Sequence, residues 1–204
     1  MRTDYNLSFT AASLRPELAR VVAEAYLATG DWELAKQRVL ATNALQCRTV
    51  AGGERQEREL RRRLMRLTMK QIVVLAEATA EDRAAMAWLA AIKHIRFAFE
   101  FAADVLREKL VVRDPILRPS DYETYVETRA VIHPEITELS PASKYKIRQV
   151  LLRMLREGGL LGDGTSLGTV LRPVLSPAAL QAILDDDSRW LAGFLVPDME
   201  TGRL

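Results

Sequence analysis

The sequence predicts an all-α protein with a multi-helical N-terminal domain over residues 1–112 and a second domain over residues 113–204. Its composition favours helices, because aromatic residues make up only 6% of the chain while 49% of residues are hydrophobic. The apolar residues recur mostly at helical spacing. The segment RDPILRPS at 113–120 holds two prolines and no helical pattern, so we place the domain boundary there.

Four helices are expected in the N-terminal half, each set off by a start or stop signal. Gly30 can adopt the positive φ that ends a helix, and Asp31 directly after it can cap the next one. Gly52-Gly53 allows a turn ahead of an arginine-rich helix, and Thr68 can cap the short helix that follows. The expected helices cover residues 16–29, 32–42, 54–67 and 69–77.

A strongly apolar stretch runs from Thr79, which with Asp82 is typical of a helix start, to Val111. Apolar residues occur nearly all round it, so we expect the central buried helix here, with at most one break. The stretch is not expected to span a membrane, because its longest uncharged apolar run, Ala84–Ile92, is much shorter than the roughly twenty residues required. One cysteine (Cys47) and an N-terminus without an apolar stretch favour a cytoplasmic protein with no membrane partner.

In the second half we expect helices and one small β-hairpin. The expected helices cover residues 121–132, 141–157 and 177–184, and the expected strands 160–161 and 170–174. Ser120 or Asp121 should cap the first of these helices. Ser140-Pro141 is a strong start for the second, since a capping serine precedes proline at the first helical position. Residues 196–204 are expected to be loosely held.

The order of these elements resembles a winged helix-turn-helix: a helix, a turn, a basic helix and then a hairpin. In such folds the second helix enters the major groove of DNA and the hairpin rests on the backbone. Similar layouts also occur in modules that bind only proteins.

Two of the expected helices carry basic residues on the face opposite their apolar residues. From Arg48 to Lys70 the chain holds eight basic and three acidic residues, whereas the formal net charge of the whole chain is only +2. A helix that buries leucine and exposes arginine can dock on a core while offering guanidinium groups to a polyanion. The candidate residues for binding double-stranded DNA are Arg55, Arg58, Arg62, Arg66, Lys144, Lys146, Gln149, Arg153 and Arg156.

Other interpretations of these faces remain open. Arginine-rich faces are often simply solvated, and Glu54, Glu57 and Glu59 should partly neutralise the first one. In one alternative the protein is a scaffold that docks its basic faces on acidic surfaces of partner proteins. In another, the basic faces bind RNA. Because arginine and lysine mostly contact phosphates, recognition of a particular base sequence is the less favoured mode.

The sequence indicates no catalytic site, metal site or cofactor. His94 lies in the apolar stretch and is interpreted as a packing histidine, whereas His133 precedes a proline and should be exposed. Cys47 is interpreted as a small buried side chain. The acidic run 185–187 is typical of a solvated helix end. The nearby Trp190 is interpreted as a core anchor or an interface residue. We therefore expect a non-catalytic protein.

Several stretches of the sequence are similar to the BrxA family. They are YNLSF at 5–9, GDW at 30–32, LQCRT at 45–49, FAADVLREKL at 101–110 and IRQVLLRMLREGGLL at 147–161. The similarity extends from Tyr5 to Pro197. BrxA proteins are small components of bacterial BREX phage-defence systems, which methylate host DNA and block replication of phage DNA. The resemblance implies an all-helical DNA-binding protein without catalysis of its own, with other BREX components as partners.

Overall fold

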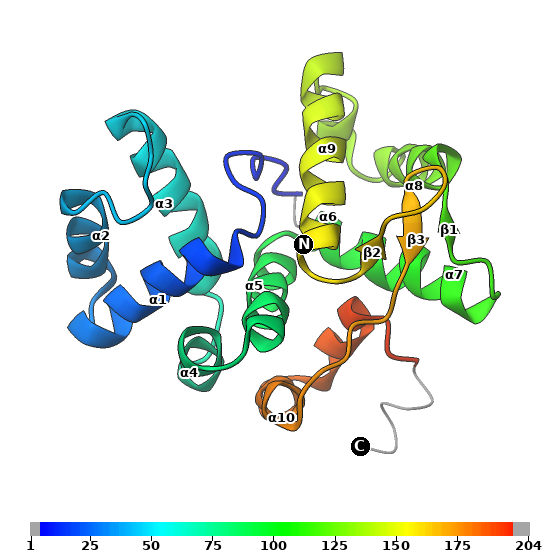
Figure 1. The fold of residues 1–204 in the computed structure, drawn as a ribbon. Helices are drawn as coiled ribbons and strands as arrows, with labels where there is room; N and C mark the ends of the chain where they lie inside the picture. The colour runs from blue at the N-terminus through cyan, green and yellow to red at the C-terminus, as the bar shows by residue number, and fades with distance from the viewer. Residues whose placement is uncertain (1–4, 198–204) are drawn as a thin grey trace.

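The computed structural model describes residues 5–197, which are mostly helical with a small three-stranded sheet (Figure 1). The first half holds α1 (Pro16–Thr29), α2 (Trp32–Ala41), α3 (Val50–Leu64), α4 (Met69–Glu77), α5 (Ala80–His94), α6 (Arg96–Glu100), the π-helix η1 (Phe101–Leu106) and α7 (Arg107–Val111). The second half holds β1 (Ile116–Leu117), α8 (Pro119–Ala130), the 3-10 helix η2 (Pro134–Ile136), α9 (Pro141–Glu157), β2 (Leu161–Gly162), β3 (Gly168–Val170), α10 (Pro177–Leu184) and the 3-10 helix η3 (Ser188–Phe194).

Local capping signals set most helix ends as expected. Gly30 ends α1 with φ 68°, and the Asp31 carboxylate accepts hydrogen bonds from the first backbone N–H groups of α2. Thr68 caps α4 in a reciprocal arrangement with Gln71, and the Ser140 hydroxyl accepts from the backbone of Ser143 at the start of α9. Each bond satisfies a backbone donor that the helix itself leaves unpaired.

The turn expected at Gly52 and Gly53 is wrong, because both glycines lie in the first turns of α3. Thr49 caps this helix by accepting a hydrogen bond from the Gly52 N–H at 3.1 Å. A side chain at Gly52 would place its Cβ 2.8 Å from the Thr49 hydroxyl oxygen. The glycine pair therefore permits close packing around the cap rather than breaking the helix.

The start of α8 also differs from the expectation. Neither Ser120 nor Asp121 is the cap, because the helix begins at Pro119 and Arg118 occupies the capping position. The Asp121 carboxylate accepts a hydrogen bond from the Arg118 backbone N–H at 2.6 Å. Proline has no N–H to leave unpaired and suits the first helical position, so the helix starts earlier than a serine signal suggests.

The expected hairpin is present but is part of a three-stranded antiparallel sheet with the order β1-β3-β2. Leu161 pairs with Val170 across β2 and β3, and Leu117 pairs with Gly168 across β1 and β3. The β3 strand lies earlier than expected, and β1 falls inside the segment in which we placed the domain boundary. Strands of two or three residues carry too little sequence pattern to be recognised.

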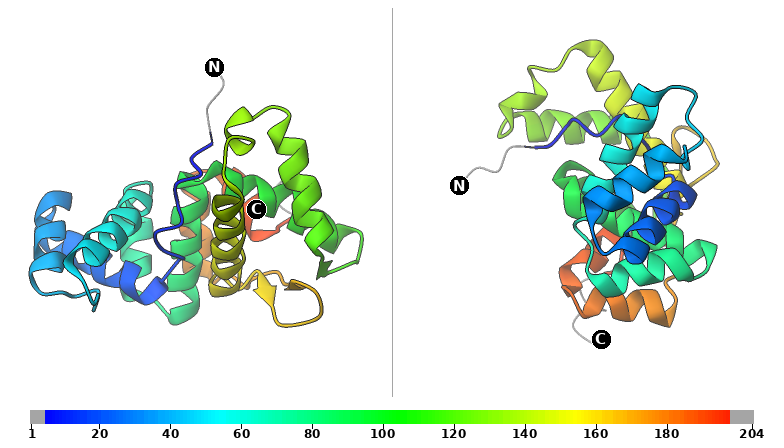
Figure 2. Two further views of the ribbon diagram at one scale, coloured as in Figure 1. Left: turned by 90° about the horizontal axis from the view of Figure 1, so that it is seen from above. Right: turned by 90° about the vertical axis from the view of Figure 1, so that its left-hand side faces the viewer.

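The apolar stretch forms the buried centre, with α5 followed by a break at Ile95 (φ −115°, ψ 87°). Trp88 on α5 is fully buried, and its indole nitrogen donates to the Gly193 carbonyl at 2.9 Å. The helix resumes as α6, widens into η1 and continues as α7, so Ile95 is the one break that we allowed for. Figure 2 places α2 and α3 at one end of the molecule and α8 at the other, with α5 and α9 between them.

Contacts cross the boundary proposed at residue 113, and the division into 1–112 and 113–204 stays a prediction. The Gln71 side chain of α4 donates to the Ala182 carbonyl of α10 at 2.9 Å. His133, which we expected to be exposed, is buried because its ring stacks on Tyr5 from the other end of the chain, with 3.7 Å between centroids. No helix among residues 5–197 is long and apolar enough to cross a membrane.

Candidate nucleic-acid interface

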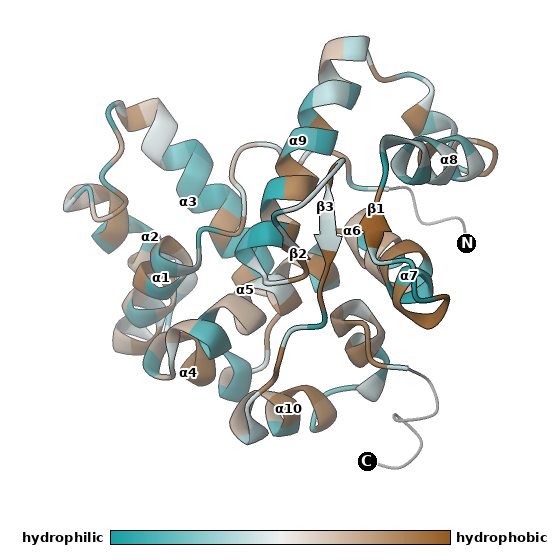
Figure 3. Cartoon of the chain, turned by 45° about the vertical axis from the view of Figure 1, so that its right-hand side comes forward, coloured by the Kyte–Doolittle hydropathy of each residue, from teal (hydrophilic) through white to brown (hydrophobic). Residues whose placement is uncertain are grey.

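Helix α3 has a buried leucine face and an exposed arginine face, as its sequence spacing predicts. Leu60 and Leu64 are each only 1% exposed and pack in the hydrophobic core. The four arginines proposed for this face are all exposed: Arg55, Arg58, Arg62 and Arg66. Figure 3 colours the middle of α3 as hydrophilic. The helix ends at Leu64, so Arg66 extends the face from the turn that follows.

Two of the three glutamates that we expected to neutralise this face, Glu57 and Glu59, do not do so. Glu57 is buried and pairs with Arg61 at 2.7 Å, and burial raises the pKa of its carboxyl. Glu59 is also buried and pairs with Arg63 at 2.7 Å. Among residues 5–197, Arg58 forms no ion pair, nor do Arg62 and Arg66. Glu57 and Glu59 thus bind Arg61 and Arg63, whereas Glu54 is exposed four residues before Arg58 on the same helix.

Arg63 has a structural role that its place in an arginine-rich run conceals. Its guanidinium is buried and donates hydrogen bonds to the carbonyls of Phe9, Ala12 and Ser13, at 2.7 to 3.1 Å. Burial lowers its pKa, and the neighbouring Glu59 carboxylate opposes that shift. The planar five-donor guanidinium suits a site with three carbonyls and one carboxylate. Arg63 therefore attaches the N-terminal segment to α3.

Helix α9 presents the second set of candidate residues. Ile147, Leu151 and Met154 are buried, whereas the candidates Lys144, Lys146, Gln149, Arg153 and Arg156 are all exposed. Three of the five have partners within the protein. Gln149 donates to the Tyr145 hydroxyl at 2.7 Å, Arg153 lies 3.7 Å from the Glu157 carboxylate, and Arg156 donates to the Leu167 carbonyl at 2.7 Å. The last bond connects α9 to the β2–β3 loop.

The two basic faces stand on separate helices. In Figures 1 and 2 the N-terminal segment passes between α3 and α9. Hydrogen bonds hold this segment on both sides, to Arg63 of α3 and to Glu157 at the end of α9. The structure fixes how the two faces are placed, but it does not merge them into a single stripe.

A groove that the sequence analysis missed lies beside α3 and consists of two neighbouring cavities. One cavity of about 340 Å³ is lined by Arg62, Met65, Arg66 and His94. His94 also lines a neighbouring cavity of about 290 Å³, whose lining includes Lys93, Arg96, Glu100 and Arg189. The three cations each pair with a carboxylate, Lys93 with Asp186, Arg96 with Glu100 and Arg189 with Asp187. The Arg189 guanidinium lies 4.4 Å from the centroid of the Trp190 ring. These residues come from α3, α5, α6 and η3, so no local sequence pattern could have grouped them.

His94 is half-buried at the wall shared by these cavities. Its Nε2 lies 3.1 Å from the Asn6 amide nitrogen, and its buried Nδ1 has no hydrogen-bond partner among the described residues. Burial lowers the pKa of His94; Glu59 opposes the shift, while Arg66, Arg63 and Arg62 add to it. The interpretation as a packing histidine is therefore incomplete, because the ring also faces two cavities.

The fold and these surfaces define a class: a small, mostly helical protein with two separate exposed basic faces. The described residues contain no group of three or more histidine, cysteine, aspartate or glutamate side chains that could hold a metal ion.

The chain matches the BrxA family over residues 3–187 and belongs to that family, which confirms the resemblance found in its sequence.

Relatives and a solved structure extend this assignment. The BREX protein BrxA of Bacillus cereus (strain H3081.97) is 24% identical over 141 residues, which cover 69% of this chain and 70% of the relative. The BREX protein BrxA of Escherichia coli O9:H4 (strain HS) is 23% identical over 141 residues, which cover 69% of this chain and 66% of the relative. The crystal structure of an uncharacterized protein from Magnetospirillum magneticum has the same fold, with a TM-score of 0.83 and 18% identity over 95% of this chain and 98% of that one.

Proposed function

We propose that this protein is a non-catalytic component of a BREX phage-defence system that binds double-stranded DNA and acts with other BREX components. The names of its relatives support the assignment to BREX. The observation that carries the DNA-binding part is the outward face of α3, where Arg58, Arg62 and Arg66 are exposed and form no ion pair with the described residues. Such uncompensated arginines are suited to phosphates.

The second half of the chain supports the same proposal through the order of its elements. The sequence β1, α8, η2, α9, β2, β3, with the sheet order β1-β3-β2, matches the layout of a winged helix-turn-helix. In this interpretation α9 enters the major groove and the β2–β3 loop is the wing. The bond from Arg156 to the Leu167 carbonyl would then fix the wing relative to the recognition helix.

The proposed mechanism is electrostatic. Guanidinium and ammonium groups neutralise backbone phosphates and release the counterions condensed on the duplex. If four to six phosphates are contacted, the logarithm of the affinity should fall with the logarithm of the salt concentration at a slope of about −4 to −5. Tyr145 and Gln149 are exposed on α9 beside the basic residues and are the groups placed to reach base edges.

Fluorescence anisotropy of the purified protein with a short labelled duplex of random sequence, measured across a salt series, tests this proposal. Binding with a steep salt dependence supports it. No binding at low salt overturns it, and a pull-down against other BREX components would then test whether the basic faces dock on acidic protein surfaces. Competition with structured RNA completes the test, because stronger binding to RNA than to the duplex would assign the basic faces to RNA.

A further inference from the structure

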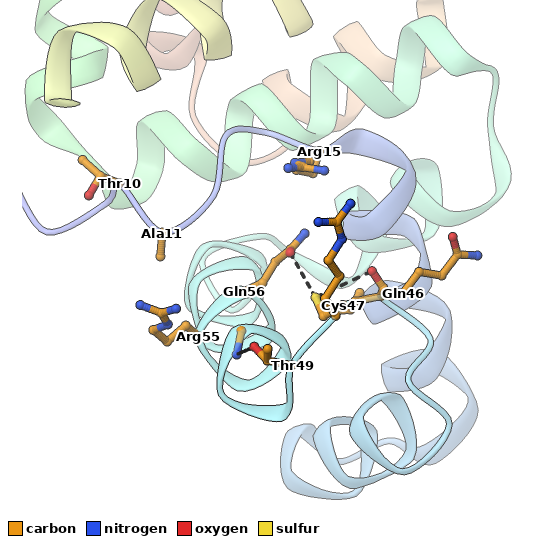
Figure 4. Close-up of a pocket in the computed structure, with 11 residues that line it drawn as sticks. Thr10, Ala11, Arg15, Gln46, Cys47, Thr49, Arg55 and Gln56 are labelled. Atoms are coloured by element: carbon orange, nitrogen blue, oxygen red, sulfur yellow. Dashed lines mark hydrogen bonds between the residues drawn. The ribbon is translucent and has the colours of Figure 1, made fainter.

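A polar cavity of about 460 Å³ lies where the N-terminal segment, the α2–α3 loop and the start of α3 meet. Figure 4 shows Arg15 reaching it from the beginning of α1, and Thr49, Arg55 and Gln56 reaching it from α3. Arg48, from the loop before α3, also lines the cavity. Three arginines from three parts of the chain therefore surround one hollow, and no aspartate or glutamate lines it.

The backbone holds Arg15 in a conformation that residues other than glycine rarely adopt. Arg15 lies in the left-handed region, with φ 48° and ψ 59°, and precedes α1 without capping it by its side chain. The Glu157 carboxylate fixes this turn by accepting hydrogen bonds from the N–H groups of Leu14 at 2.7 Å and Arg15 at 3.2 Å. Strained backbone of this kind persists only where its surroundings enforce it. Here it directs an arginine side chain into the cavity.

Two further residues that line the cavity, Arg55 and Gln56, are oriented by contacts within the protein. The Gln56 oxygen lies 3.3 Å from the Cys47 sulfur, whereas its buried Nε2 has no hydrogen-bond partner among the described residues. The Arg55 Nε donates to the Ala51 carbonyl at 3.3 Å, which orients its guanidinium. A buried amide donor without an acceptor is unfavourable, and this one belongs to a residue that lines the cavity.

We propose that this cavity binds a phosphate group. Guanidinium groups are the side chains best matched to phosphate oxygens, and the adjacent N-terminus of α3 adds a favourable potential. The volume is within the range of about 300 to 1,000 Å³ that is typical of small-ligand pockets, so a pyrophosphate or a mononucleotide would fit. The inference goes beyond the proposed binding of a duplex to exposed helix faces, because this site is concave and includes Arg15 and Arg48, which lie outside both faces.

The phosphate has two chemical sources, a free phosphorylated ligand or the backbone of a nucleic acid bound on α3. Isothermal titration calorimetry with inorganic pyrophosphate tests the site itself. We expect the wild-type protein to bind pyrophosphate. The double variant Arg15→Gln/Arg48→Gln should bind it at least about tenfold more weakly, because it loses charge-assisted hydrogen bonds, which are stronger than neutral ones.

A matched control separates this site from general charge attraction. Arg38→Gln/Arg113→Gln removes the same charge from two exposed positions that do not line the cavity. Circular dichroism confirms that each variant is folded. Pyrophosphate binding that is absent from the wild type, or lost equally in the control, overturns the proposal.

The source of the phosphate is resolved by duplex DNA binding with the same variants. If pyrophosphate competes with DNA and Arg15→Gln/Arg48→Gln weakens both, the cavity holds a backbone phosphate. If the variant weakens only pyrophosphate binding, the cavity holds a free phosphorylated ligand. The site assignment survives even if the wild type binds no DNA, so its failure and the failure of the proposed function are distinguishable.

Discussion

Arg63 of α3 and Glu157 at the end of α9 bind the same N-terminal segment from its two sides. Arg63 donates to the carbonyls of Phe9, Ala12 and Ser13, while Glu157 accepts from the Ser13 hydroxyl and from the N–H of Leu14. The segment thereby connects the two helices that expose basic faces. Two buried or half-buried charges thereby help to set the positions of these faces, together with α5, against which both helices pack.

The first prediction concerns Arg63. Arg63→Ala leaves the buried Glu59 carboxylate unpaired and removes the donor from three carbonyls. Removing one partner of a buried ion pair costs about 3 to 5 kcal/mol, and we expect a loss of unfolding free energy of that size in urea denaturation. Arg62→Ala is the matched control, because Arg62 is exposed and should change stability by no more than about 0.5 kcal/mol. Equal stability of the two variants would contradict the structural role of Arg63.

The second prediction concerns the outward face of α3. Arg58→Ala/Arg62→Ala should weaken duplex binding about equally for all sequences, because phosphates carry no base information. The log–log salt slope should become less steep by about 2, since each lost phosphate contact removes about 0.9. Arg38→Ala/Arg113→Ala removes the same charge from exposed positions outside α3 and α9 and should change the slope little. A folded α3 double variant with unchanged affinity would refute this site assignment.

The features that could be predicted from the sequence are those that depend on residues close to one another in the chain. The opposed faces of α3 and α9 follow from helical periodicity, and caps such as Asp31 and Ser140 act within a few residues of themselves. The structural role of Arg63 could not be predicted, because the carbonyls that it binds belong to Phe9, Ala12 and Ser13 in a distant part of the sequence.

Features that depend on tertiary packing escaped the sequence analysis. His133 is buried because Tyr5, more than a hundred residues away, stacks on it. The phosphate-site candidates Arg15, Arg48 and Arg55 meet only when the N-terminal segment lies against α3. Such groupings leave no spacing in a single sequence, and the two-residue β1 carries no alternation that would identify a strand.

The third prediction separates binding from structure on α9. Lys144 and Lys146 are exposed and form no ion pair with the described residues, so Lys144→Ala/Lys146→Ala should weaken DNA binding without lowering the melting temperature. Arg156 donates to the Leu167 carbonyl, so Arg156→Ala should cost about 1 kcal/mol and speed amide hydrogen exchange in the β2–β3 loop. Anisotropy, thermal unfolding and hydrogen exchange measure these effects. Unchanged hydrogen exchange in the β2–β3 loop of Arg156→Ala would show that this bond does not hold the loop.

The fourth prediction concerns His94 and pH. Burial lowers its pKa below the ordinary value of 6.5, so as the pH falls below 6.5 the unfolded chain binds a proton here before the folded chain does. The neutral ring therefore contributes stability that is fully present above 6.5 and is lost as the pH falls toward the folded-state pKa. The charges that act on the ring are Glu59 of α3, which opposes the shift, and Arg66, Arg63 and Arg62, which add to it.

His94→Gln removes the titrating group while keeping a polar side chain beside Asn6. Urea unfolding of both proteins at several pH values between about 7.5 and 5.5 measures the effect, because most carboxylates titrate below this range. The wild type should lose more stability than His94→Gln over this interval, so that the two curves converge as the pH falls. Parallel curves would mean that His94 titrates alike in the folded and unfolded chains, and that it is open to water rather than held at the wall of the groove.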